Sequence, residues 1–248
     1  MKASFYKYFA LWILFGAGLS CTKESKPAGS AALTVVNAVA GSDPFLIPIF
    51  GGDTLATYVG AYQLRYGATM LTGNYTGKQR LTFYHYPDTG AHSAALYHLD
   101  IDLPVGSIHT LFLTGTTSSA DTLFTTDVIP YHPSSDSSVG IRFVNLMAGS
   151  APVSVNLAGA AQGSEISSLP YKGITPFTNY SATAAISDYT FEFHDAASGT
   201  LIGTYLLSGV NDTFSNSRRF RNLTLALIGI PGDPATQRIM LIEAYTLY

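Results

Sequence analysis

The chain has 248 residues, of which 47% are hydrophobic and only 12% are charged, and its formal net charge is −3. This composition excludes an intrinsically disordered chain, which would contain few hydrophobic and many charged residues. The weakly acidic balance provides no basic surface for nucleic acid or for an anionic membrane. The many glycines and tyrosines favour strands and turns over helices.

The N-terminal segment has the layout of an export signal. Lys2 and Lys7 precede an apolar run over residues 9–19, which is shorter than the roughly 20 apolar residues that span a bilayer. Cys21 follows directly after small residues and is the only cysteine. The segment resembles a bacterial lipoprotein signal, in which the cysteine becomes the acylated first residue. We expect a signal peptide over residues 1–20 and lipidation of Cys21; the alternatives are a plain secretory signal or a retained anchor.

A polar stretch separates this signal from the first strand pattern. Residues 22–30 contain Pro and Gly and show no hydrophobic periodicity, so the lipidated cysteine and its tether are assigned to residues 21–31. The expected location is the bacterial cell envelope, at the outer membrane, with the protein anchored by lipid and facing the periplasm or the cell surface.

The rest of the chain contains an internal repeat. Residues 36–44 read VNAVAGSDP and residues 144–152 read VNLMAGSAP, an offset of 108 that also relates Phe83 to Phe191. Farther on, HTLFLTG (109–115) resembles LTLALIG (223–229) with an offset of 114. An insertion in the second copy, within residues 211–221, explains this change. The predicted domains are residues 32–131 and 139–248, with a linker over 132–138.

Short apolar runs alternate with turn residues inside each copy. No long window has helical spacing, and each copy of about 100 residues holds roughly seven strand-like segments, which is typical of an immunoglobulin-like sandwich. We therefore predict an all-β protein of two tandem immunoglobulin-like β-sandwich domains. The clearest strand patterns cover residues 33–39, 80–86, 96–103, 108–115, 141–147, 189–194, 201–207, 223–230 and 239–245.

The turn shared by the two copies is predicted to be structural. Gly41 and Gly149 suit a backbone position with positive φ. Asn37 and Asn145 end an apolar strand, and Asn side chains commonly bond nearby backbone amides in such turns. The alternative interpretation is a ligand site at these two asparagines.

These motifs carry a family resemblance. The opening strand, the Asn-x-x-Ala-Gly-Ser-x-Pro turn, the second short strand ending in Gly and the late Leu-x-Leu-x-Gly strand resemble domain-of-unknown-function family 4397. The resemblance covers nearly all of the chain after the signal. It implies envelope proteins, often with tandem copies, and implies no established activity.

No group of residues predicts a metal centre or an active site. The histidines of the first copy, His85, His92, His98 and His109, are scattered without the short spacing that zinc sites show. Asp100 and Asp102 share one strand face, and Leu206 and Ser208 stand in the comparable region of the second copy, so a solvated face is favoured over catalytic carboxylates or a calcium site. The sequence contains no nucleophile elbow or phosphate loop. We expect no cofactor.

Two groups of side chains are candidates for a ligand face. Exposed tyrosines form binding surfaces at low entropic cost, and arginines commonly anchor such surfaces. The alternatives are tyrosines that simply form strands and arginines that keep an edge strand soluble. The candidate residues are Tyr84, Tyr86 and Tyr97 with Arg218, Arg219 and Arg221.

A third pattern concerns modification. Thr54, Thr122 and Thr213 each follow an aspartate and precede an apolar residue. The pattern resembles O-glycosylation sites of some gram-negative bacteria, and the alternative is an Asp turn that leads into a strand.

Taken together, the sequence predicts a non-enzymatic, lipid-anchored envelope protein that presents β-sandwich domains to a glycan, a protein or a matrix. Its expected partners are the membrane, through the lipid, and an envelope glycan or protein, with no nucleic acid. The alternatives are a purely structural spacer and a glycan-active hydrolase with a dispersed site.

Overall fold

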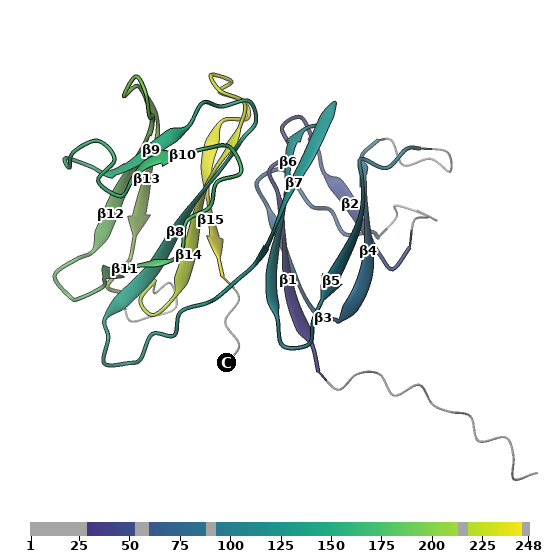
Figure 1. Ribbon diagram of the computed structural model, residues 1–248, viewed down its shortest axis with the longest axis horizontal. Helices are drawn as coiled ribbons and strands as arrows, with labels where there is room; N and C mark the ends of the chain where they lie inside the picture. Colours follow the sequence, from purple (N-terminus) through teal and green to yellow (C-terminus); the bar gives the residue numbers. More distant parts are fainter. Residues whose placement is uncertain (1–28, 53–59, 88–92, 213–217, 245–248) are drawn as a thin grey trace, which may run out of the picture.

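The computed structural model describes residues 29–52, 60–87, 93–212 and 218–244, and within these ranges every regular element is a β-strand (Figure 1). The strands form several packed sheets, and the predicted all-β, sandwich-type fold is confirmed. The described ranges contain no helix that is long and apolar enough to cross a membrane.

The first half of the structure consists of two sheets, with strand orders β3-β1-β6-β7 and β2-β4-β5. Their inner faces enclose one cluster of buried apolar side chains, which includes Leu33, Leu46, Phe83 and Leu111. The strands are β1 (Ala31–Asn37), β2 (Leu46–Phe50), β3 (Thr69–Tyr75), β4 (Gly77–His85), β5 (Tyr97–Leu103), β6 (Ile108–Thr116) and β7 (Ser119–Thr126).

The second half repeats this arrangement, with strand orders β11-β8-β14-β15 and β10-β9-β12-β13. Its own core includes Phe143, Val155, Phe191 and Leu225. The strands are β8 (Ser138–Met147), β9 (Val153–Leu157), β10 (Ile166–Leu169), β11 (Thr178–Ser181), β12 (Asp188–Asp195), β13 (Leu201–Ser208), β14 (Asn222–Gly229) and β15 (Arg238–Glu243).

Strand pairing agrees with both offsets of the sequence repeat. In the parallel pair β1–β6, Asn37 lies opposite Leu113, and in the parallel pair β8–β14, Asn145 lies opposite Leu227. Phe83 and Phe191 are both fully buried. The connection from β13 to β14 is longer than that from β5 to β6, and the insertion expected over residues 211–221 falls in it.

The central strands β1, β6, β8 and β14 are buried along almost their whole length because both of their faces are covered. One face of each strand belongs to the core of its own half. The other faces meet in a third apolar cluster that both halves share, and this burial on both sides accounts for their continuous hydrophobic sequence. The four sheets therefore form four stacked layers (Figure 1).

Equivalent positions of the repeat meet in this shared cluster. Val36 and Val144 are related by the offset of 108, and so are Tyr66 and Ile174. The two halves thus join through the same face, as the subunits of a two-fold symmetric dimer do.

The polar contacts across the shared cluster do not follow this symmetry. Arg142 of the second half forms an ion pair with Asp127 at the end of β7, with 2.7 Å between Nη1 and Oδ1. At the position of the first half that corresponds to Arg142 stands Thr34. The Tyr66 hydroxyl donates to the Thr236 carbonyl at 2.6 Å, near the far edge of the same sheets.

The predicted linker over residues 132–138 is fixed to the second half. His132 is buried and hydrogen-bonds through its two ring nitrogens to Ser138 Oγ (2.9 Å) and Asn222 Oδ1 (3.0 Å). Gly140 leaves the space for this contact, since a Cβ there would lie 2.0 Å from Asn222 Oδ1. The predicted division into two domains stays a prediction, because the shared cluster joins the halves.

Candidate functional site

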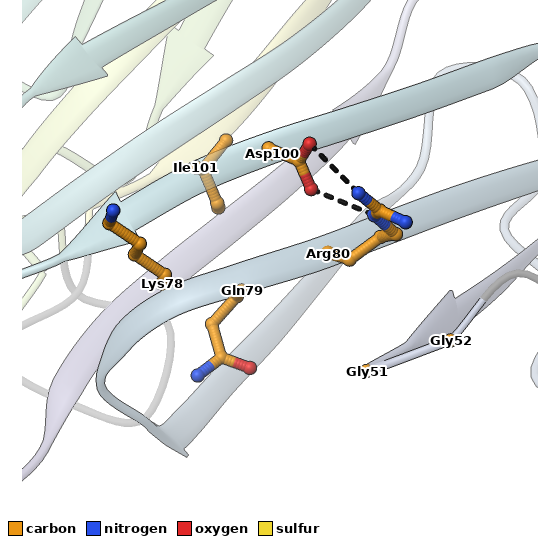
Figure 2. Close-up of a pocket in the computed structure, with 7 residues that line it drawn as sticks. All are labelled: Gly51, Gly52, Lys78, Gln79, Arg80, Asp100 and Ile101. Carbon is orange, nitrogen blue, oxygen red and sulfur yellow. Dashed lines mark hydrogen bonds and ion pairs between the residues drawn. The ribbon is translucent and has the colours of Figure 1, made fainter.

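A groove with a volume of about 660 Å³ lies on the surface of the first half. It lies along β4 and β5 and beside the turn that follows β2 (Figure 2). Its lining residues are Gly51, Gly52, Lys78, Gln79, Arg80, Asp100 and Ile101.

Strand register brings the two main charged groups of the groove together. Arg80 on β4 lies opposite Asp100 on β5. The guanidinium binds the carboxylate through two contacts, Nε to Oδ1 at 2.8 Å and Nη2 to Oδ2 at 3.1 Å (Figure 2). The hydrogen bonds from Arg80 hold the pKa of Asp100 below its usual value. Both side chains are well exposed, at 50% and 72%, so the pair faces solvent.

Backbone contacts hold the glycine turn against β4. The Gly51 amide donates to the Arg80 carbonyl at 2.9 Å, and the Thr82 hydroxyl donates to the Gly52 carbonyl at 3.0 Å. Gly51 has a φ of 74°, which a residue with a side chain adopts poorly. Because Gly51 and Gly52 have no side chains, this side of the groove is open.

The groove offers hydrogen-bond donors on Lys78, Gln79 and Arg80 and acceptors on Asp100 and Gln79. Such a mixture suits a ligand that presents hydroxyl or amide groups. Asp102, the other carboxylate of the strand, lies opposite Lys78 and is outside the lining. The solvated strand face that the sequence favours for Asp100 and Asp102 agrees with this exposed geometry.

The second half has different residues at the corresponding positions. Because Phe83 pairs with Tyr97 and Phe191 pairs with Tyr205, Asp100 corresponds to Ser208 rather than to Leu206. Opposite Ser208 stands Asp188, in the place of Arg80. The charged pair is therefore a property of the first half.

The structure does not bring the three predicted tyrosines together on one exposed face. Tyr84 and Tyr97 are only 6% and 5% exposed. Tyr97 packs edge-on against Phe83 inside the core and donates to the Thr114 carbonyl at 2.8 Å. Burial raises the pKa of its hydroxyl well above the usual range. Tyr86 packs on Phe45. Strand alternation is the reason, since Tyr84 points away from the face that Phe83 and Tyr97 share.

The three arginines lie in the second half. Arg221 binds Glu243, and Arg218 lies 4.0 Å from the same carboxylate. Arg219 contacts Ser137 and lies over the Phe220 ring, 4.9 Å from its centre. The three arginines precede β14, a central strand of its sheet, so they do not lie on an edge strand, and a ligand face at these residues stays a prediction.

Both asparagines of the repeated turn make the same set of hydrogen bonds. Asn37 Nδ2 donates to Ser42 Oγ and to the Leu64 carbonyl, both at 3.0 Å, and its Oδ1 accepts from the Val39 amide at 3.1 Å. Asn145 Nδ2 donates to Ser150 Oγ at 3.0 Å and to the Leu169 carbonyl at 3.2 Å, and its Oδ1 accepts from the Met147 amide at 3.1 Å.

Both asparagines are fully buried. Gly41 and Gly149 have φ values of 82° and 75°. Both polar atoms of each side chain are thus bonded, partly within its own turn and partly to a carbonyl of a distant segment.

The remaining candidates are dispersed or lie outside the described residues. Within the described ranges no three His, Cys, Asp or Glu side chains gather in a way that could hold a metal ion. Thr122 on β7 is half-buried, and its amide donates to Asp121 Oδ1. The predicted positions outside the described residues are Cys21, Thr54, His92 and Thr213.

No family model matches the chain, and no curated protein matches it. Nine chains of solved structures match it. One of them, described as "Alpha-glucan binding by a streptococcal virulence factor", is 11% identical, with a TM-score of 0.28, and the match covers 86% of this chain and 96% of that one. A likeness at this level carries no conclusion about function.

Sequence reasoning missed Lys78 and Arg80 as site residues. A signal for them was present, because Lys78 and Arg80 alternate on one strand face just as Asp100 and Asp102 do on the next strand. Reading the two runs as antiparallel partners would have placed opposite charges side by side.

Proposed function

We propose that this protein is a lipid-anchored protein of the bacterial cell envelope that binds a glycan, a protein or a matrix component, and that the groove along β4 and β5 is the binding surface. The observation that carries the proposal is this groove of about 660 Å³ with an exposed Arg80–Asp100 pair on its floor. The bidentate contact holds both charged groups in a defined orientation on the exposed face of the sheet.

The polar lining gives this proposal its ligand chemistry. Binding sites commonly place a few convergent polar groups on a rigid support. Here Lys78, Arg80 and Asp100 stand on two paired strands, so their spacing is fixed by the sheet. The spacer role remains the second candidate, and it requires no ligand.

Binding to a glycan array and to solubilised envelope proteins tests the proposal. The doubly substituted chain Arg80→Ala/Asp100→Ala should lose the binding that the unchanged chain shows. The matched control is Asp188→Ala/Ser208→Ala, which alters the corresponding pair of the second half. Equal binding by all three chains would remove the groove from the function, and absence of any ligand would favour the spacer.

The anchor is tested separately. Cys21→Ser should abolish palmitate labelling and release the protein from the membrane fraction. Labelling that persists in this variant would contradict lipidation at Cys21.

A further inference from the structure

A second hollow lies where the two halves meet. It has a volume of about 470 Å³ and is formed by the end of β7, the segment that follows it, and the segment that leads into β11. Its lining residues are Thr125, Thr126, Asp127, Val128, Pro130, Arg142, Ile174, Thr175, Pro176 and Phe177. Ligand sites commonly form at such junctions.

Arg142 is the main donor that faces this hollow. An arginine side chain carries five N–H groups. One bonds Asp127 Oδ1 at 2.7 Å, and Nε bonds Thr224 Oγ1 at 2.8 Å. The other three N–H groups have no protein partner in the part of the chain that the structure describes. The side chain is 7% exposed and is held in place, so these donors are presented in a fixed direction.

The acceptors beside Arg142 are already occupied. Asp127 Oδ1 accepts from Arg142 and from Thr125 at 3.0 Å, and Oδ2 accepts from Thr110 at 2.5 Å. The Asp127 side chain is only 3% exposed. The hollow therefore offers donors, while the one carboxylate in its lining is already bonded and cancels the arginine charge.

Most of the remaining wall is apolar. The Phe177 ring lies against the Arg142 guanidinium, with 4.5 Å from Cζ to the ring centre. Val128 stands at the rim and is 84% exposed. Among the described residues β7 pairs only with β6, and β11 pairs only with β8, so each is an edge strand of its sheet. An exposed edge beside a hollow is the arrangement that peptide-binding β-domains use.

We propose that this hollow binds an extended, uncharged peptide segment. The segment pairs as an additional strand with the edge of β7 and places an apolar side chain between Val128 and Phe177. One of its backbone carbonyls accepts hydrogen bonds from the remaining N–H groups of Arg142. The peptide's own N–H groups would donate to backbone carbonyls at the edge of β7. Asp127 cannot accept them because its oxygens are already hydrogen-bonded. This site is separate from the groove proposed above.

Two other ligand classes fit the hollow less well. A sugar would find the one carboxylate of the hollow, Asp127, already bonded, and it cannot pair along the edge of β7 as an extended peptide backbone does. A carboxylate ligand would lie close to Asp127, which already neutralises Arg142. A neutral peptide carbonyl needs only the donors of Arg142 and is not repelled by the charge of Asp127.

The test uses the purified full-length chain and follows its backbone amides by NMR while acetyl-alanyl-leucyl-alanyl-amide is added. Amide shifts should concentrate in residues 125–130 and 174–177. The same peptide with glutamate in place of leucine, and the sugar maltose, should produce no shifts there.

Three variants assign the binding to named groups. Arg142→Lys keeps a positive charge beside Asp127 but loses the guanidinium fork, and it should weaken peptide binding by about tenfold. Val128→Asp changes an exposed residue, leaves folding intact and should weaken binding at least as much. Its matched control is Val105→Asp, at a residue 52% exposed outside the hollow, and this variant should bind normally.

Several results of these experiments would overturn the proposal. Shifts that are absent, or that fall elsewhere, exclude a peptide site in this hollow. Shifts with maltose alone would assign the hollow to sugars, and binding that survives both Val128→Asp and Arg142→Lys would exclude the named contacts. Arg80→Ala/Asp100→Ala should leave peptide binding unchanged, so failure of the groove and failure of the hollow are distinguishable.

Discussion

The two halves of the molecule agree where the fold needs them to agree and differ where they could contact something else. Asn37 and Asn145, which are 108 positions apart, make equivalent hydrogen bonds in their two halves. Phe83 and Phe191 are buried at equivalent positions of the two cores. The charged pair of the groove has no counterpart in the second half.

The buried ion pair at the junction differs in the same way. Arg142 stands in the second half, while the equivalent residue of the first half is Thr34. The comparison teaches that the repeated residues maintain the sandwich. The unrepeated polar residues are therefore the ones to examine for function.

The strongest test of equivalence removes the core phenyl rings. Phe83→Ala and Phe191→Ala should each lower the free energy of unfolding by about 3–5 kcal/mol, because each ring is fully buried and leaves a cavity. Chemical denaturation followed by circular dichroism measures both. Costs that differ by more than about twofold would show that the two cores are not equivalent.

The next test addresses the junction. Arg142→Ala leaves the Asp127 carboxylate buried without its ion-pair partner, which should cost about 3–5 kcal/mol of unfolding free energy. Thr34→Ala, at the corresponding position of the first half, should cost only about 1 kcal/mol. Similar costs for the two variants would contradict the asymmetry.

Simultaneous replacement sharpens this second test. Arg142→Met/Asp127→Leu removes both charges and should be much closer to the unchanged protein than Arg142→Ala is, because no unpaired charge remains. Denaturation midpoints measured at one salt concentration are sufficient for this comparison.

A smaller effect is expected at the repeated turn. Asn37→Ala and Asn145→Ala should each cost about 1–2 kcal/mol of stability, since each orphans buried backbone partners of the side chain. Ligand binding by the folded fraction should not change in either variant. Loss of binding by a protein that remains folded would assign the turn to a ligand site instead.

The smallest effect concerns the groove and depends on pH. Because the folded-state pKa of Asp100 lies below its unfolded value, the pair contributes stability above the unfolded pKa, and this contribution is lost as the pH falls through the folded pKa. In Arg80→Ala the pKa of Asp100 should rise toward its ordinary value. A carboxyl-carbon NMR titration measures it, and an unchanged titration would disprove the role of Arg80.

Much of the fold could be predicted from the sequence because alternation and repetition are local signals. All nine predicted strand patterns coincide with observed strands. The strands β2, β3, β7, β9, β10 and β11 are not among them, and several are short or rich in polar residues, such as TNYS for β11. Their positions are set by pairing with the buried central strands rather than by their own composition.

The candidate sites were less accessible to sequence reasoning. Arg80 and Asp100 are 20 residues apart, and Arg142 and Asp127 come from different halves of the chain. Only the pairing of strands and the stacking of sheets bring them together. The predicted tyrosine face was wrong because local sequence does not show whether a tyrosine ring in a strand is exposed or buried, as the ring of Tyr97 is.

The parallel pairing of β1 with β6 has a mechanical consequence for an anchored protein. β1 is the first strand of the described residues, and it is bonded to β3 on one side and to β6 on the other. A pull along the chain from that end loads the hydrogen bonds of β1 in shear, all at once, instead of opening them one after another. The strand nearest the expected tether is therefore the one placed to resist tension.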